Sequence, residues 1–209
     1  MSVAENSLSA TAALTAKGRA TRARIIERAA VLMYRDGVAA TSTEAILKAA
    51  GVSNSQLYHY FADKGDLTHA VIAHQIERVV GRNEELLAEM DSLAVLEGWR
   101  DALVEFASRR EGQGGCPIGS LASELADVDE PSRTLLLAGM ERWRAAIRVG
   151  LTNAKARGEL RVDADPDHLA LASLAALQGG ALLTQASRDA APLKAGLDAA
   201  IGYIRSFAT

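Results

Sequence analysis

The sequence has little cysteine, proline or aromatic content: one cysteine, four prolines, and 4% aromatic residues among 209. A lone cysteine, Cys116, cannot form an internal disulfide, which excludes a disulfide-stapled secreted fold and indicates a cytoplasmic protein. Scarce aromatic residues disfavour an all-β protein, and no stretch shows the alternating pattern of a strand. Abundant alanine, leucine, arginine and glutamate favour helices. The composition therefore predicts an all-α fold.

A signal peptide is not indicated, because residues 1–16 lack a basic start followed by an apolar run. One uncharged stretch, from Leu169 to Ser187, is long enough to suggest a membrane span. It contains polar residues such as Gln178 and Thr184, and much of the rest is alanine. A helix buried between other helices fits this composition better than one in lipid, so we expect no membrane partner.

The formal net charge of −3 conceals an asymmetry along the chain. Residues 1–65 carry eight basic and five acidic side chains, whereas residues 66–209 carry fifteen and twenty-one. Between Lys17 and Arg35 there are six basic residues and one acidic residue. A basic end on an acidic chain is typical of a protein that contacts phosphates, although a solvated helix face has the same composition.

Two capping patterns lie close together near the N-terminus. The segment from Thr41 to Glu44 places a hydroxyl three residues before a carboxylate and predicts a helix over 42–50. The segment from Ser53 to Gln56 repeats the pattern and predicts a second helix over 53–60. Gly51 separates them, and two short helices joined by such a turn form a helix-turn-helix.

The remaining chain also has helical periodicity. Asp63 is expected to cap a helix that runs to about Met90, and Asp91 or Ser92 to cap the next one. Further helices are predicted over 118–127, from Pro131 to Gly158, from Pro166, and from Pro192 to the C-terminus. The glycine-rich segment 112–117 must form a loop or sharp turn between helices.

Within residues 21–72, about a quarter of the chain, one set of residues has a characteristic spacing: Arg24-Ile25-Ile26, Ala29-Ala30, Gly37, Thr43, Ile46, Ala49-Ala50-Gly51-Val52-Ser53, Leu57-Tyr58-His59-Tyr60-Phe61, Lys64 and Leu67. On these residues the segment resembles the tetracycline-repressor-like (TetR) family of transcriptional regulators. The resemblance departs at Gly65, where the family often has glutamate. It implies three parts: a disordered tail over 1–16, a three-helix DNA-binding domain over 17–64, and a helical bundle over 65–209 for ligand binding and dimerisation.

The second helix of the predicted helix-turn-helix has the chemistry of a reading helix. A major groove admits one α-helix, and side-chain amides such as those of Asn54 and Gln56 can hydrogen-bond base edges, adenine best. The helix N-terminus at Ser53 offers backbone N–H groups to a phosphate, and His59 is equally compatible with packing or with DNA. By resemblance, phosphate or base contacts are expected from Thr43, Ser55, Tyr58, Tyr60 and Lys64.

Two apolar stripes in the second half are candidate pocket walls, although stripes of this kind more often form core. The resemblance favours a pocket, because this half of TetR-like proteins usually encloses an effector. Few charges lie on the stripes, so we expect an apolar or weakly polar ligand, with the turn at 112–119 as its gate and Gln178 as a polar anchor. The candidate effector-binding residues are Trp99, Leu103, Phe106, Cys116, Ile118, Leu136, Met140, Trp143, Ile147 and Gln178.

A homodimer is expected through the last two helices. The uncharged segment 169–187 has more apolar and small surface than one subunit needs, and Gly179, Gly180 and the alanines permit close helix approach. The final helix is expected to add Leu193, Leu197, Ile201 and Ile204 to a four-helix interface.

No metal, cofactor or catalytic constellation is expected. His69 and His74 are five residues apart and do not share a helix face, and Cys116 has no histidine near it in sequence. The sequence and the resemblance together predict a ligand-responsive transcriptional repressor. It is expected to bind a double-stranded, inverted-repeat DNA operator as a homodimer and to be released by a small apolar or weakly polar effector. The alternatives are an all-helical ligand-binding protein without DNA binding, or an enzyme that uses the same C-terminal pocket.

Overall fold

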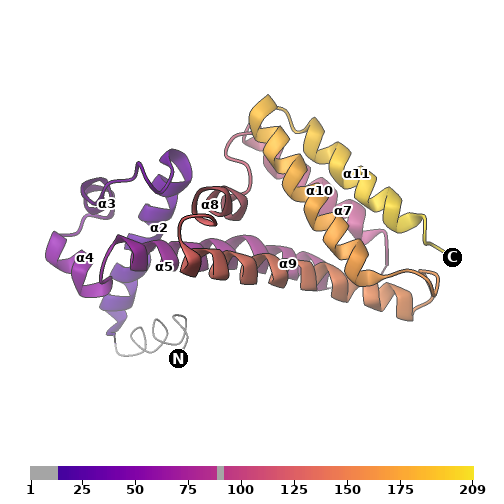
Figure 1. Ribbon diagram of the computed structural model, residues 1–209, viewed down its shortest axis with the longest axis horizontal. Helices are drawn as coiled ribbons and strands as arrows, with labels where there is room; N and C mark the ends of the chain where they lie inside the picture. The colour runs from indigo at the N-terminus through magenta and orange to yellow at the C-terminus, as the bar shows by residue number, and fades with distance from the viewer. Residues whose placement is uncertain (1–13, 89–91) are drawn as a thin grey trace. The chain divides into compact units, whose positions relative to one another are not determined.

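The computed structural model describes residues 14–88 and 92–209. The regular elements of these residues are helices, and their one β-type contact is an isolated antiparallel bridge between Leu160 and Ala208 (Figure 1). The all-α fold predicted from the composition is confirmed. Internal contacts divide the chain into an N-terminal unit that ends at His74 and a C-terminal unit from Gln75 to Thr209. The functional boundary expected at residue 64 stays a prediction.

The first described helix, α2 (Ala16–Asp36), begins directly after Thr15, whose hydroxyl oxygen accepts the Gly18 N–H at 3.1 Å. Ala16, expected in a disordered tail, is therefore helical, because Thr15 supplies a side-chain cap. Residues 1–13 of the expected tail lie outside the described residues. α2 ends at Gly37, whose positive φ of 86° suits glycine. It buries Ile25, Ile26, Ala29, Ala30 and Met33.

Helices α3 (Thr43–Ala50) and α4 (Asn54–Tyr60) form the predicted helix-turn-helix. The first cap lies one residue later than predicted, because Ser42 rather than Thr41 accepts a helix N–H, from Ala45 at 3.2 Å. The Thr41 hydroxyl instead donates to the Gly37 carbonyl at 2.7 Å, which closes the loop after α2. Thr41 and Glu44 thus form no capping box.

The single helix predicted from Asp63 is interrupted by one wider turn. It consists of α5 (Lys64–Ile76), the π-helical segment η1 (Glu77–Gly81) and α6 (Arg82–Ala88), and its expected end at Met90 lies outside the described residues. The predicted cap is present, since the Asp63 carboxylate accepts the Asp66 N–H at 2.8 Å. The wider turn is supported by the Asn83 side-chain amide, which donates to the Val79 carbonyl at 2.7 Å.

The C-terminal unit continues with α7 (Val95–Arg109), α8 (Pro117–Leu125), α9 (Glu130–Ala156), α10 (Pro166–Ser187) and α11 (Ala191–Arg205). Helix α7 starts without a side-chain cap, so Ser92 does not cap it as one alternative predicted, and Asp91 lies outside the described residues. A tertiary bond holds this entrance instead: the Leu93 N–H donates to the Glu159 carboxylate at 3.0 Å.

Helices α10 and α11 lie side by side (Figure 1). A Cβ on Gly180 would come within 2.9 Å of the Leu193 Cα, so glycine permits this close approach. α10 also packs on α9. By length and composition α10 is long and apolar enough to cross a membrane, and 44% of that apolar stretch is buried inside the protein.

Candidate DNA-reading helix and interior polar cluster

Helix α4 begins with the capping box that the sequence predicted. The Gln56 N–H donates to the Ser53 hydroxyl at 3.2 Å, and the Ser53 N–H donates to the Gln56 side-chain oxygen at 3.0 Å. Two otherwise unpaired backbone donors are thereby satisfied, which explains how a seven-residue helix keeps its first turn. The bond also occupies the acceptor half of the Gln56 amide. A bidentate contact from Gln56 to adenine would therefore require the capping box to open.

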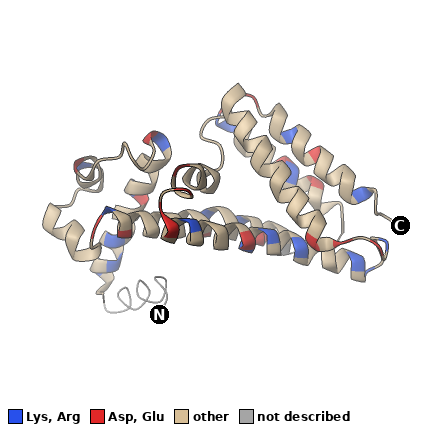
Figure 2. Ribbon diagram, viewed as in Figure 1, with Lys and Arg blue, Asp and Glu red and all other residues tan. Residues whose placement is uncertain are grey.

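The outer face of α4 consists of short polar and aromatic side chains. Asn54, Ser55 and His59 are exposed, and Tyr58 is 51% exposed, whereas Leu57 is 4% exposed and anchors the helix to its unit. The helix carries no charged side chain (Figure 2). Its exposed groups can therefore donate and accept hydrogen bonds at base edges or phosphates, while ionic contacts must come from neighbouring segments.

Tyr60 and Thr43, two further candidates, are half-buried. The Tyr60 ring meets His59 edge-on, with ring centroids 4.9 Å apart. Its hydroxyl would lie 3.6 Å from a Cβ placed on Gly18, so it reaches the first turn of α2. Thr43 is the first residue of α3, directly after the Ser42 cap. Both side chains thus lie near the N-terminus of a helix.

Two basic side chains of the N-terminal unit contact the ends of α3 and α4. The Arg24 guanidinium donates to the Ala50 carbonyl at 2.9 Å, at the end of α3 and directly before Gly51, which is left-handed with φ 62°. The Arg22 guanidinium lies 5.1 Å from the centre of the Phe61 ring, just after α4. Part of the basic excess predicted to face phosphates therefore supports the turn between the two helices.

Lys64, at the start of α5, has an internal partner. Its ammonium donates to the Val38 carbonyl at 2.6 Å and lies 3.5 Å from that of Ala39. The side chain is half-buried and ties α5 to the loop after α2. An ammonium has three donors, so the predicted phosphate contact is compatible with this bond.

The candidate effector residues all belong to the C-terminal unit, but they differ in burial. Phe106 is 47% exposed beneath the Arg110 guanidinium, so it does not join the interior set. Leu103, Cys116, Met140 and Gln178 are half-buried. The buried members are Trp99, Ile118, Leu136, Trp143 and Ile147.

The two tryptophans have different hydrogen-bonding states. The Trp99 indole N–H donates to the Asn83 side-chain oxygen at 2.7 Å, and Asn83 in turn donates to Val79 in the π-helical segment. The Trp143 indole nitrogen is buried without a hydrogen-bond partner, as are the Gln75 side-chain oxygen and the Ser132 hydroxyl. The sequence suggested both tryptophans as pocket walls but gave no signal for Asn83, since its role depends on the unpredicted π turn.

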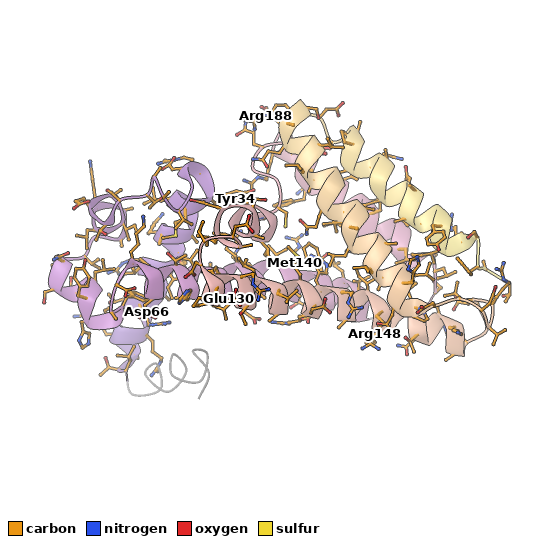
Figure 3. All side chains as sticks on the ribbon, in the orientation of Figure 1. Tyr34, Asp66, Glu130, Met140, Arg148 and Arg188 are labelled. Carbon is orange, nitrogen blue, oxygen red and sulfur yellow. The ribbon has the colours of Figure 1, made fainter. Side chains whose placement is uncertain are left out.

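Cys116 and Gln178, predicted separately, are brought together at the N-terminus of α8. The Cys116 sulfur accepts the Gly119 N–H at 3.5 Å, and its thiol is hydrogen-bonded to the Gln178 amide. Burial raises the pKa of this thiol, which keeps it protonated. The Gln178 nitrogen also lies 3.9 Å from the sulfur of Met140, which projects from the middle of α9 (Figure 3).

The glycine-rich segment expected to act as a gate is packed against α10. A Cβ on Gly112 would lie 2.8 Å from the Thr184 carbonyl oxygen, and one on Gly115 would lie close to the Gln185 amide. Both glycines have positive φ. The segment is therefore shaped by close contacts with the end of α10.

The charged side chains of α9 pair away from this interior. Arg142 donates to the carboxylates of Glu84 and Glu77, and its hydrogen bond lowers the pKa of Glu84. Arg144 pairs with Glu141 and Asp167. Across the part of the chain that the structure describes, no three His, Cys, Asp or Glu side chains gather as a metal site would require.

Comparisons with known proteins match both halves of the chain. Residues 25–71 match the model of bacterial regulatory proteins of the tetR family, and residues 92–200 match the tetracyclin repressor-like C-terminal domain. The transcriptional regulator AcuR of Cereibacter sphaeroides is 32% identical over 149 residues, which are 70% of this chain and 68% of AcuR. The transcriptional repressor DhaR of Mycobacterium sp. is 26% identical over 175 residues, 82% of this chain and 86% of DhaR.

Solved structures are similar along nearly the whole chain. A TetR transcriptional regulator from Chloroflexus aurantiacus is 30% identical and superposes with a TM-score of 0.83 over 93% of this chain and 98% of its own. A regulatory protein TetR from Rhodobacter sphaeroides is 25% identical, with a TM-score of 0.77 over 86% and 96% of the two chains.

Proposed function

This chain belongs to the TetR family of transcriptional regulators, and we propose that it is a repressor that binds an inverted-repeat operator as a homodimer in the cytoplasm and is released by a small effector. The observation that carries the proposal is α4, a capped helix whose exposed face is made of Asn54, Ser55, Tyr58 and His59. Its relatives are regulators rather than enzymes, and some carry the name repressor.

The capping box gives Gln56 a structural role in α4 and leaves other residues of the helix to contact DNA. Because Gln56 stabilises the first turn, we expect Asn54, Ser55 and His59 to read bases. We expect the hydroxyl of Tyr58, a residue that is 51% exposed, to contact a phosphate or base. The experiment is an electrophoretic shift assay on the DNA that flanks the gene. Tyr58→Ala should abolish the shift without loss of helix content, and Tyr58→Phe separates the hydroxyl from the ring. If Tyr58→Ala unfolds the protein, the residue packs and does not contact DNA.

The dimer surface that we propose is the face of α10 turned away from its own unit. Leu171, Leu182 and Leu183 are 53%, 65% and 58% exposed there, and together they form an apolar patch of the kind that marks an interaction surface. Small residues lie between them on the same stripe: Ala175, Gly179 and Ala186. A Cβ on Gly179 would meet nothing within 4 Å, so this glycine is open to a partner helix.

The contribution expected from α11 needs a correction. Leu193, Leu197, Ile201 and Ile204 are at most 5% exposed, because they pack inside the subunit, and Gly180 faces Leu193 within the same chain. Helix α11 leaves Ala195, Ala199 and Gly202 exposed, together with the larger Lys194, Tyr203 and Arg205. The proposed four-helix interface therefore combines the α10 leucines with the small exposed residues of α11 and with Tyr203.

Sedimentation equilibrium tests this interface. Gly179→Arg places a charge at the centre of the proposed seam and should give folded monomers that bind operator poorly. Asn153→Arg, on the exposed end of α9, is the matched control and should leave the dimer intact. If the Gly179→Arg protein still sediments as a dimer, the dimer interface does not include this face of α10.

In a dimer, effector binding can change operator binding by changing the distance between the two DNA-reading helices. Two reading helices must reach successive major grooves about 34–36 Å apart, or a multiple of that spacing. An effector that binds one spacing better than the other shifts the population toward it, and so releases or retains the operator. The interior residues Trp143, Met140 and Gln178 are the effector contacts that we favour, because they combine burial with polar groups.

A further inference from the structure

Helix α9 holds two buried hydrogen-bond donors without a partner, the Ser132 hydroxyl in its first turn and the Trp143 indole N–H in its middle. Trp143 is 2% exposed, and its indole nitrogen has no partner. Buried donors are nearly always paired, and an unpaired one is costly because it has lost its contact with water. The other interior tryptophan obeys this rule, since Trp99 donates to Asn83. Trp143 is thus the exception, within the set of side chains proposed to hold the effector.

The position of Trp143 on α9 follows from its neighbours. A Cβ on Gly139 would lie 2.6 Å from Ile76, so this residue faces the end of α5, while Met140 faces Gln178 of α10. At about 100° per residue, Trp143 projects about 40° from Gly139 and about 60° from Met140. Its side chain therefore points between the directions of α5 and α10.

The polar groups along this direction are uncharged. The Gln178 amide nitrogen has a thioether sulfur at 3.9 Å, a weak acceptor, and the Cys116 thiol is held protonated by burial. The two cations that flank Trp143 on α9 are already paired, Arg142 with Glu77 and Glu84, and Arg144 with Glu141 and Asp167. A carboxylate or an ammonium placed here would be buried without a counter-charge, which is strongly unfavourable.

We infer that the effector is an uncharged, largely apolar molecule with a carbonyl-type acceptor, and that the Trp143 N–H is the donor that recognises it. The Gln178 amide supplies the second polar contact. This inference rests on the proposed function, because it assigns the chemistry of the proposed effector site. It excludes carboxylate effectors and explains why an unpaired donor is kept in the core.

Three probes with one ring system test the inference: 2-acetonaphthone, naphthalene and 2-naphthoate, titrated into the full-length protein by ligand-observed NMR. The ketone should bind about tenfold more tightly than either of the others, the value of one added hydrogen bond. Trp143→Phe should remove this advantage, so that the ketone binds no more tightly than naphthalene does. Asn153→Ala, at an exposed position of α9 outside the proposed site, is the control and should keep the tenfold ratio.

The indole protons give a readout that does not depend on a variant's stability. The chain has two tryptophans, so two indole N–H resonances are expected. The ketone should shift the resonance of Trp143 and leave that of Trp99 in place. Equal or tighter binding of naphthoate, no binding of any probe, or an unmoved Trp143 resonance would each overturn the inference. Operator shift assays without probe decide the proposed function separately, since DNA binding does not depend on these results.

Discussion

The two tryptophans allow the hydrogen-bond assignment of the interior to be tested by matched substitutions. Trp99→Phe and Trp143→Phe remove the same atoms from side chains that are 3% and 2% exposed, so the loss of apolar burial largely cancels between them. Trp99→Phe also leaves the Asn83 oxygen buried without a donor, which costs about 1–3 kcal/mol. Trp143→Phe leaves no partner unsatisfied, because the indole has none.

We therefore expect Trp99→Phe to lower the free energy of unfolding by about 1–3 kcal/mol more than Trp143→Phe does. Urea unfolding followed by far-UV circular dichroism measures both, at one protein concentration because a dimer's stability depends on concentration. The denaturant slopes of the two variants should agree. Equal losses, or a larger loss for Trp143→Phe, would mean that the Trp143 N–H has a partner in the folded protein and would refute the reasoning.

Three further outcomes follow from single contacts. Gly139→Ala places a Cβ 2.6 Å from Ile76 and should lower the free energy of unfolding by about 1–3 kcal/mol, measured by thermal melts. An unchanged melting temperature would contradict the close contact between Gly139 and Ile76. Because burial raises the pKa of Cys116, iodoacetamide should alkylate the native thiol at pH 8.5 about tenfold more slowly than the urea-unfolded one, and equal rates would contradict this. Since folding holds that proton, its contribution to stability is present below the thiol's unfolded pKa and is lost as pH rises above it. If the Lys64 ammonium contacts a phosphate, Lys64→Ala should reduce the slope of log K for operator binding against log salt concentration by about 0.9. An unchanged slope together with a lower melting temperature would mean that Lys64 only bonds the Val38 carbonyl and does not contact DNA.

Local features were predictable from the sequence because they depend on neighbours in the chain. The capping box at Ser53 and Gln56 needs only residues three apart, and the left-handed Gly51 needs only the absence of a Cβ. Helical periodicity likewise located the buried face of α2, including Ile25 and Met33. The family was predictable for a related reason, since its motif lies within one short segment.

Tertiary structure decided how the same residues are used. Thr41 is not a cap, because its hydroxyl meets the Gly37 carbonyl, and Lys64 reaches a carbonyl 26 residues away in sequence. Leu197, expected at a dimer interface, is fully buried in its own subunit, because the close approach of α10 and α11 hides it. Periodicity tells which side of a helix is apolar, but what covers that side depends on contacts between distant segments. The unpaired N–H of Trp143 belongs to the same class, because only the packing around an indole shows whether an acceptor comes within reach.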